Sequence, residues 1–189
     1  SNELIARIDA DDIWDYKKME IQLKYLEEHK NVSLLGTNVL EFLGDKSNVV
    51  SLVSLPSDYN DILNYSKYRN PFRHSSLVYK KSEVLKCGNY RDYPYFEDYD
   101  LWLRMIINGC ECFNLEDPLT YMRISEDFYM RRGGVKYLQH MKRFRKEYYK
   151  NKYFSFKSYY CSIISHSLVC LLPNFVRKFI YIKMLRKKV

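Results

Sequence analysis

The sequence predicts a mixed α/β fold followed by a basic helical tail. Short apolar runs of strand length alternate with longer segments in which apolar residues recur every three or four positions. The 189 residues are 47% apolar and 16% aromatic, which is sufficient for a hydrophobic core. Charge is unevenly distributed along the chain. Residues 1–130 contain 15 Lys and Arg and 22 Asp and Glu, whereas residues 131–189 contain 16 Lys and Arg and a single Glu. We therefore expect two parts, 3–130 and 131–189.

The first predicted elements are three strands and a helix. Residues 4–8 are apolar and predict a buried strand. Apolar residues recur at helical spacing over 15–30, which predicts a helix. The apolar stretch 32–43 ends at Gly44, and residues 48–55 follow as a returning strand. This pair predicts a hairpin.

The middle of the chain predicts three helices and one strand. A helix is expected from Pro56-Ser57 to about residue 68, where Asn70-Pro71 ends it. Residues 75–79 predict a strand, and a short helix over 82–88 ends at a glycine. A further helix is expected over 97–108, again with a glycine just beyond its end.

The last predicted strands are 111–115 and 119–124, separated by a turn at Asp117-Pro118. The basic part then predicts helices at about 135–150 and 159–172. The front part is therefore α/β and the tail is helical.

Three carboxylates, Asp9, Asp11 and Asp12, follow the first predicted strand within four positions. Carboxylates this close repel one another unless a cation or several hydrogen-bond donors neutralise them. A Mg²⁺ or Mn²⁺ ion would do so, because both take oxygen ligands and leave positions open for phosphate oxygens. Alternatively, Asp11 or Asp12 caps the next helix and Asp9 is a solvated loop residue. Spacing alone leaves both interpretations open.

Two other motifs place carboxylates at this spacing. A calcium-binding EF-hand loop starting at Asp9 needs glycine at its sixth position, where the chain has Trp14, so this interpretation is excluded. A phosphatase of the haloacid-dehalogenase type also has D-x-D after an apolar strand. It follows the motif with a small residue and Thr or Val, where this chain has Asp12 and Ile13. That phosphatase remains an alternative.

A second acidic group, Glu97, Asp98 and Asp100, lies in the first turn of a predicted helix. Carboxylates there interact favourably with the helix dipole, which would explain them without any catalytic role. A carboxylate at such a helix end can also project into a cleft and act as general base toward a hydroxyl group. The pattern is compatible with both roles.

Three stretches follow one another in order: ARIDADD, then NPFRHSSLVYKKSEVLKCGNYRDYPYFEDYDLWLRMIINGC, then NLEDPLTYMRISEDFYMRR. In order and spacing they resemble the family 2 glycosyltransferases of bacterial surface-polysaccharide synthesis, over roughly residues 4–132. The resemblance implies a partial GT-A fold, which is a Rossmann-like α/β domain. It also implies transfer of a sugar from a nucleotide-sugar, here expected to be UDP-linked, with inversion at the anomeric carbon.

The resemblance also implies roles for individual residues. Asp9 and Asp11 match the D-x-D motif that holds Mg²⁺ or Mn²⁺, with Asp11 as the direct ligand, and Asp98 matches the catalytic base. Residues expected to contact substrate are Asp12, Glu97, His74, Arg131 and Arg132. Two of these assignments have structural alternatives: His74 as a hydrogen-bonded structural histidine, and the arginine pair as the solvated start of the basic tail.

One departure from the family concerns the segment before the D-x-D motif. Family members have a first βαβα portion with an earlier aspartate pair, whereas only residues 1–8 precede Asp9 here. We therefore expect a carboxy-terminal portion that does not bind nucleotide-sugar with useful affinity and is inactive alone. The acceptor is expected to be a hydroxyl of a glycan or lipid-linked glycan. The alternative function is a non-catalytic remnant that binds membrane or a partner enzyme.

The tail predicts a membrane contact. Its apolar stretch 163–172 is too short to span a bilayer. Residues 174–189 alternate apolar and basic side chains, as in an amphipathic helix that lies on an anionic membrane surface. Alternatively, this apolar face packs on the catalytic part or on a partner chain. Nucleic acid is not expected, because no nucleic-acid-binding motif accompanies the charge.

The five cysteines include no C-x-x-C pair and are expected to be reduced thiols. The predicted location is therefore the cytoplasm, peripheral on the inner face of the cell membrane.

Overall fold

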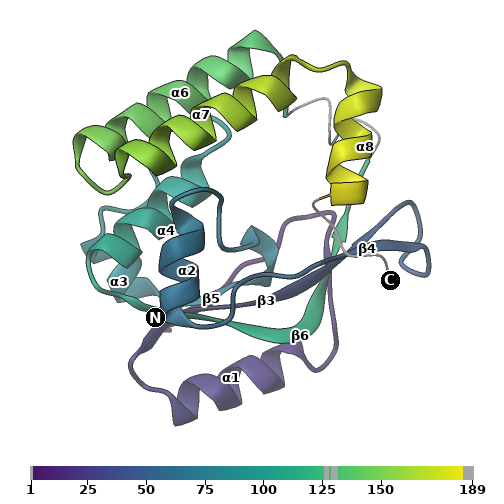
Figure 1. Cartoon of the computed structure of the whole chain (residues 1–189). Coiled ribbons are helices and arrows are strands. Elements are labelled where there is room, and N and C mark those ends of the chain that lie inside the picture. Colours follow the sequence, from purple (N-terminus) through teal and green to yellow (C-terminus); the bar gives the residue numbers. More distant parts are fainter. Residues whose placement is uncertain (1, 126–127, 129–131, 185–189) are drawn as a thin grey trace.

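The computed structural model describes residues 2–125, 128 and 132–184, and it confirms a mixed α/β architecture (Figure 1). Six strands form one sheet in the order β1-β5-β3-β6-β2, with β4 paired to β3 outside this path. Among the strands of the described residues, β3 and β6 are the only parallel pair, and the other pairs are antiparallel. The strands are β1 (Leu4–Ala6), β2 (Ile13–Trp14), β3 (Val32–Phe42), β4 (Val49–Val53), β5 (Val78–Lys80) and β6 (Glu111–Arg123).

Helices lie on both sides of this sheet. In Figure 1, α1 lies below the sheet, α2, α3 and α4 lie on the opposite side, and α6 and α7 run side by side above them. The helical elements are α1 (Lys18–Glu28), α2 (Tyr59–Ser66), the 3₁₀ turn η1 (His74–Ser76), α3 (Lys81–Lys86), α4 (Glu97–Ile107), α6 (Gly134–Lys150), α7 (Phe156–Leu171) and α8 (Asn174–Met184). Within the described residues, no helix is long and apolar enough to cross a membrane.

Helix α4 is the centre of the core. One of its faces packs with α2, α3 and the sheet around Trp102, which is fully buried. Its other face, through Tyr99 and Leu103, packs against Met141 and Phe144 of α6. Because aromatic and aliphatic side chains from both parts share this second cluster, the first tail helix is held against the helix that carries Asp98.

The predicted turn at Asp117-Pro118 is wrong, because β6 runs without interruption through these residues. The pairing of β6 with β3 shifts register on both sides of Asn38, which lies opposite Pro118. Asn38 Nδ2 donates a 2.7 Å hydrogen bond to Glu116 O. A side-chain hydrogen bond therefore takes the place of a main-chain hydrogen bond between β3 and β6 near the proline. A strand can therefore absorb Pro118 as a local irregularity rather than a turn.

Two other boundaries differ from the sequence prediction. The strand expected at 75–79 is instead the turn η1 followed by β5. The two-residue strand β2, which pairs with β6, was not predicted, since so short a strand has no periodicity to detect. The predicted hairpin of 32–43 with 48–55 is confirmed by the antiparallel pairing of β3 and β4.

Candidate active site

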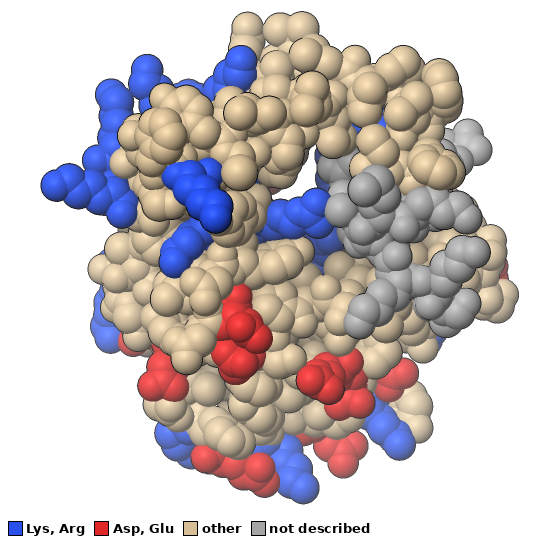
Figure 2. All heavy atoms as spheres, viewed as in Figure 1, with Lys and Arg blue, Asp and Glu red and all other residues tan. Residues whose placement is uncertain are grey.

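A cavity of about 530 Å³ lies between the loop that follows β1, the amino-terminal end of α4 and the helix α7. Figure 2 shows the hollow beneath the helices, with basic side chains visible inside it. The cavity brings together residues that are up to 161 positions apart in the sequence. The predicted site residues that line it are Asp9, Asp11, Asp12, His74, Glu97, Asp98 and Arg132.

The carboxylate loop, residues 9–12, forms one wall of this cavity. Asp12 N donates to Asp9 O at 3.1 Å, which closes a tight turn. Arg7 Nη2 forms an ion pair of 3.0 Å with Asp9 Oδ1. Asp9 therefore already has a cationic partner, although both side chains are substantially exposed and such a pair is weak.

Arg123, the last residue of β6, holds the carboxylate loop in place. Its main-chain N donates to Asp12 Oδ1 at 2.9 Å, and its Nε donates to Asp11 O at 3.2 Å. Its Nη1 also donates to Gly44 O in the β3–β4 hairpin. Sequence analysis did not identify Arg123, because a basic residue inside the predicted strand 119–124 carries no distinguishing signal.

The carboxylate loop has an excess of negative charge. Burial raises the pKa of Asp12, and repulsion from Asp11 and Asp9 adds to this, although hydrogen bonds from Ser75 and from Arg123 N oppose it. Within the described part of the chain, the Asp11 carboxylate has no hydrogen bond or ion pair. The Asp11 carboxylate is thus available for an external cation.

The described residues include no group of three or more His, Cys, Asp or Glu that could hold a metal ion. One or two carboxylates of the loop could still bind a hard divalent ion whose other ligands are water and phosphate oxygens, which is the usual arrangement for Mg²⁺ at phosphate sites. The donor set therefore fits such an ion, with Asp11 as the main ligand.

Asp98 lies in the first turn of α4 and lines the same cavity as the carboxylate loop. Asn70 Nδ2 donates to Asp98 Oδ2 at 2.8 Å, and Tyr99 N donates to Asp98 Oδ1 at 2.6 Å. Asn70 is itself oriented, because its Oδ1 accepts from Phe72 N at 3.2 Å. Burial raises the pKa of Asp98, while His74 and the two hydrogen bonds oppose the shift. A carboxylate with a raised pKa is a stronger base.

His74 connects the two acidic groups. Its Nδ1 lies 4.0 Å from Asp9 Oδ1, and when the ring is protonated it lowers the pKa of Asp98. The other ring nitrogen, Nε2, is 3.0 Å from Tyr90 Oη and, in the neutral ring, accepts from Arg7 Nε at 3.3 Å. His74 is thus both hydrogen-bonded and part of the cavity wall, so the structural and functional interpretations of this residue are compatible.

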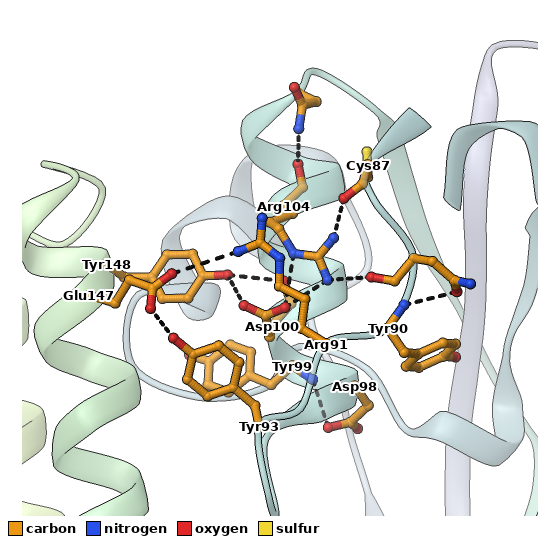
Figure 3. Close-up of polar contacts among 12 residues, drawn as sticks. Cys87, Tyr90, Arg91, Tyr93, Asp98, Tyr99, Asp100, Arg104, Glu147 and Tyr148 are labelled. Atoms are coloured by element: carbon orange, nitrogen blue, oxygen red, sulfur yellow. Dashed lines mark hydrogen bonds and ion pairs between the residues drawn. The ribbon is translucent and has the colours of Figure 1, made fainter. Parts of the chain in front are cut away.

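Asp100, the third acid of this helical turn, has a structural role. It is fully buried, and Arg104 Nε and Nη2 donate to its Oδ2 at 2.9 and 2.7 Å. Tyr148 Oη of α6 donates to its Oδ1 at 2.7 Å. Arg104 also donates to Cys87 O and Asn89 O, so this group joins α4, the 87–89 loop and α6 (Figure 3).

The tail supplies the far wall of the cavity. Arg132 lies half-buried with its guanidinium 3.8 Å from the ring centroid of Phe128. Side chains of α6 and α7 complete this wall: Tyr137, His166, Val169 and Cys170. Arg131, named as a substrate contact, lies outside the described residues, as do tail residues 185–189.

No protein-family model matches the chain. It is 34% identical over 186 residues to the UDP-Gal:alpha-D-GlcNAc-diphosphoundecaprenol beta-1,3-galactosyltransferase of Escherichia coli, which covers 98% of this chain and 67% of that protein. It is 37% identical over 139 residues to the amylovoran biosynthesis glycosyltransferase AmsE of Erwinia amylovora, which covers 74% of this chain and 52% of AmsE.

Among solved structures, one match is the mannosyltransferase PcManGT from Pyrobaculum calidifontis in complex with GDP-Man and Mn²⁺. The match covers 94% of this chain and 48% of the PcManGT chain. The TM-score is 0.52 and the identity 13%, so this likeness concerns the fold alone.

These matches define the class: the chain belongs to the glycosyltransferases, as its ordered motifs predicted. Within that class it is a partial glycosyltransferase chain, which spans two thirds of the Escherichia coli relative and about half of AmsE.

Proposed function

We propose that this chain supplies the metal-binding and acceptor-binding side of an inverting glycosyltransferase that transfers a sugar from a nucleotide-sugar to a hydroxyl group. The observation that supports it best is the shared cavity, in which the Asp11 carboxylate and the hydrogen-bonded Asp98 face the same space. A UDP-linked donor and a lipid-linked diphosphate acceptor are proposed because the Escherichia coli relative bears them in its name.

The proposed reaction is a single displacement. A divalent ion held by Asp11, with Asp9 or Asp12, would supply positive charge beside the diphosphate of the departing nucleotide. The acceptor oxygen forms a bond to the anomeric carbon as the bond from that carbon to the phosphate oxygen breaks. Asp98 accepts the acceptor hydroxyl proton, and Asn70 holds the carboxylate in position. Attack from the side opposite the leaving group inverts the configuration.

The remaining substrate contacts are proposed on position alone. Glu97 is exposed at the cavity beside Asp98, and His74 borders the same space. Arg132 lies on the far wall, where its guanidinium could meet a phosphate.

Transfer is tested in a fusion of this chain to the portion of the Escherichia coli relative that lies outside the match. Radiolabelled nucleotide-sugars are incubated with Mn²⁺ and a bacterial lipid extract, and labelled lipid is counted. We expect D98N to reduce transfer by about a thousandfold, as for loss of a general base, whereas the exposed control D92N is unaffected. Equal rates for D98N and the unsubstituted fusion would exclude Asp98 as the base.

The purified 189-residue chain is proposed to have no turnover of its own. The support is the extent of the match, since the relatives use a longer chain. The measurement is the same assay without the fusion partner, and transfer above background would contradict it. If the fusion is also inactive but the chain still binds membrane, the alternative function of a non-catalytic binding remnant is favoured.

We also propose that the tail binds the anionic inner face of the cell membrane. Large apolar side chains on α7 and α8 recur every three or four residues and are 43–75% exposed: Phe156, Tyr160, Ile164, Leu168, Leu171, Phe175 and Phe179. The 16 Lys and Arg of residues 131–189 favour an anionic lipid surface as the occupant of this stripe.

Not every tail cation is available to lipid. Arg177 is buried and donates to Val169 O, Cys170 O and Leu172 O, which satisfies the last carbonyl groups of α7. Sedimentation with vesicles tests the proposal: anionic vesicles should bind the chain, neutral ones should not, and L168S/F175S should lose most binding. Equal binding to both vesicle types would contradict the electrostatic contribution.

A further inference from the structure

One part of the cavity wall is basic and has no function in the reaction described above. Arg69 and Arg73 lie on either side of Asn70, in the segment that connects α2 to η1. His166 reaches the same cavity from α7. This basic wall, defined as Arg69, Arg73 and His166, therefore combines two segments that are almost a hundred residues apart.

Arg69 is positioned without being neutralised. Its main-chain N donates to Tyr65 O at 3.0 Å, which fixes it just beyond the end of α2. The side chain is half-buried, and within the described part of the chain its guanidinium has no hydrogen bond or ion pair. A guanidinium in a cavity without a carboxylate partner is suited to bind a phosphate, since its donors match phosphate oxygens in geometry.

His166 lies in a positive environment. Burial lowers its pKa to about 3, and the charges of Arg145 and Arg69 add to the effect. Arg145 is directed elsewhere, with Nη1 and Nη2 donating to Lys67 O and Tyr68 O. The imidazole is therefore neutral at pH 7 and can donate one hydrogen bond to an anion. The positive charge of Arg69 at this wall complements the excess negative charge at the carboxylate loop.

The position of the basic wall indicates which substrate it faces. Asn70 bonds to Asp98, so Arg69 and Arg73 lie on the side of the proposed base, from which the acceptor attacks. On α7, Val169 and Cys170 follow His166 by three and four positions, on the same face of the helix, and line the same cavity. An apolar surface thus begins within about one helical turn of the imidazole. A phosphate attached to a lipid chain would satisfy both surfaces.

We propose that Arg69, Arg73 and His166 form a subsite for the phosphate groups of a lipid-linked acceptor. The assignment rests on the proposed function, because it takes Asp98 as the base that defines the acceptor side. A free or nucleotide-borne diphosphate offers the same phosphate chemistry without the lipid, and the experiment separates these sources.

The experiment follows the ring signals of His166 by NMR in the full 189-residue chain with labelled histidine, without added metal. The probes are inorganic pyrophosphate, UDP and a short polyprenyl diphosphate in neutral detergent. We expect the polyprenyl diphosphate to shift the His166 signals and to bind at least tenfold more tightly than pyrophosphate or UDP. Equal affinity for all three probes would contradict the assignment of a lipid-linked phosphate as the ligand of this subsite.

Variants test the residues. R69Q should weaken binding of the polyprenyl diphosphate about tenfold, and R69K should restore part of the loss. The matched control is R91Q, since Arg91 is 49% exposed and lies outside this cavity. Unchanged affinity in both R69Q and R73Q would overturn the subsite.

The outcome is separable from that of the proposed function. D11N should leave binding of the polyprenyl diphosphate intact, because this subsite needs no metal. If D98N loses transfer but the polyprenyl diphosphate does not bind at the basic wall, the proposed function stands and the subsite is rejected. If the polyprenyl diphosphate binds at the basic wall but D98N transfers sugar at the normal rate, the subsite stands and the role of Asp98 as base is rejected.

Discussion

Tyr148 Oη of α6 donates a 2.7 Å hydrogen bond to Asp100 Oδ1 of α4, two residues after Asp98. A side chain of the basic tail thus reaches the buried interior of the helix that presents the proposed base. Burial and this hydrogen bond hold the pKa of Tyr148 far above its ordinary value, so the hydroxyl remains a donor throughout the physiological range. The tail is accordingly part of the support of the site, in addition to any contact with membrane.

Replacing Tyr148 by phenylalanine should destabilise the fold by about 1–3 kcal/mol, because a buried carboxylate loses one of its donors. The change is measured as the shift of the urea midpoint, with Y149F on the same helix as the control. In the active fusion, Y148F should also lower kcat more than it changes donor KM. A stability equal to that of Y149F would mean that Arg104 alone satisfies Asp100.

Lys18 is predicted to destabilise the fold near neutral pH. It is fully buried, with Nζ 4.1 Å from the centroid of the Trp14 ring, and burial lowers its pKa to about 7. Among the residues that the structure describes, Lys18 Nζ has no hydrogen-bond partner. Because the folded pKa lies below that of the unfolded chain, stability falls as the pH drops from about 10 to 7. K18M should therefore raise the free energy of unfolding, by about 2 kcal/mol more at pH 7 than at pH 9.

Denaturant titrations at both pH values measure the effect of K18M. K24M, at an exposed position of α1, is the control and should show no such pH dependence. If K18M raises the free energy of unfolding by the same amount at pH 7 and pH 9, Lys18 keeps an ordinary pKa in the fold.

His166 should make the fold sensitive to acid. Its pKa in the fold is about 3, below the ordinary 6.5, so the unfolded chain binds more protons between these values. Stability therefore falls as the pH drops through this window. When the pH is lowered from 7 to 5, the free energy of unfolding of H166Q should fall by about 2 kcal/mol less than that of the unsubstituted chain. H29Q, at the end of α1, is the control, and identical losses in H166Q and the unsubstituted chain would contradict the burial of a neutral imidazole.

Arg123 should determine the metal affinity of the carboxylate loop. R123A removes the guanidinium contacts to Asp11 O and Gly44 O but leaves the main-chain donor to Asp12. With the loop less ordered, we expect the affinity of the fusion protein for Mn²⁺ in the presence of UDP, measured by EPR, to weaken about tenfold. D11N should abolish it, and the exposed control D117N should not change it. Normal affinity in R123A would show that the loop needs no support from β6.

Much of the fold could be predicted because it depends on local patterns. The apolar run of β3, the turn after it and the stripe on α4 all carry a periodicity that the sequence displays. Pro118 was misinterpreted as a turn because its effect depends on Asn38, a residue of another strand that supplies the compensating hydrogen bond. Information of this kind is absent from the local sequence.

The site divides in the same way. Asp9, Asp11 and Asp98 were predicted from clustered charge and the ordered motifs, and the structure places them around one cavity. The residues that orient them were missed: Asn70-Pro71 indicates only the end of a helix, and Arg123 lies inside the predicted strand 119–124 without any distinguishing signal. Their partners are 28 and 111 positions away. Such contacts follow from the topology and leave no trace in spacing.

The unbroken course of β6 has a consequence for changes of chain length. Side chains alternate between the faces of a strand, so deletion of one residue between Glu111 and Leu119 would turn Thr120, Tyr121 and Arg123 to opposite faces. The partners of β2 and the anchor of the carboxylate loop would then be lost together. A loop at the same position would tolerate such a deletion. Variation in length between residues 111 and 123 should therefore be far less acceptable than substitution, even though Asp117-Pro118 gives this segment the composition of a turn.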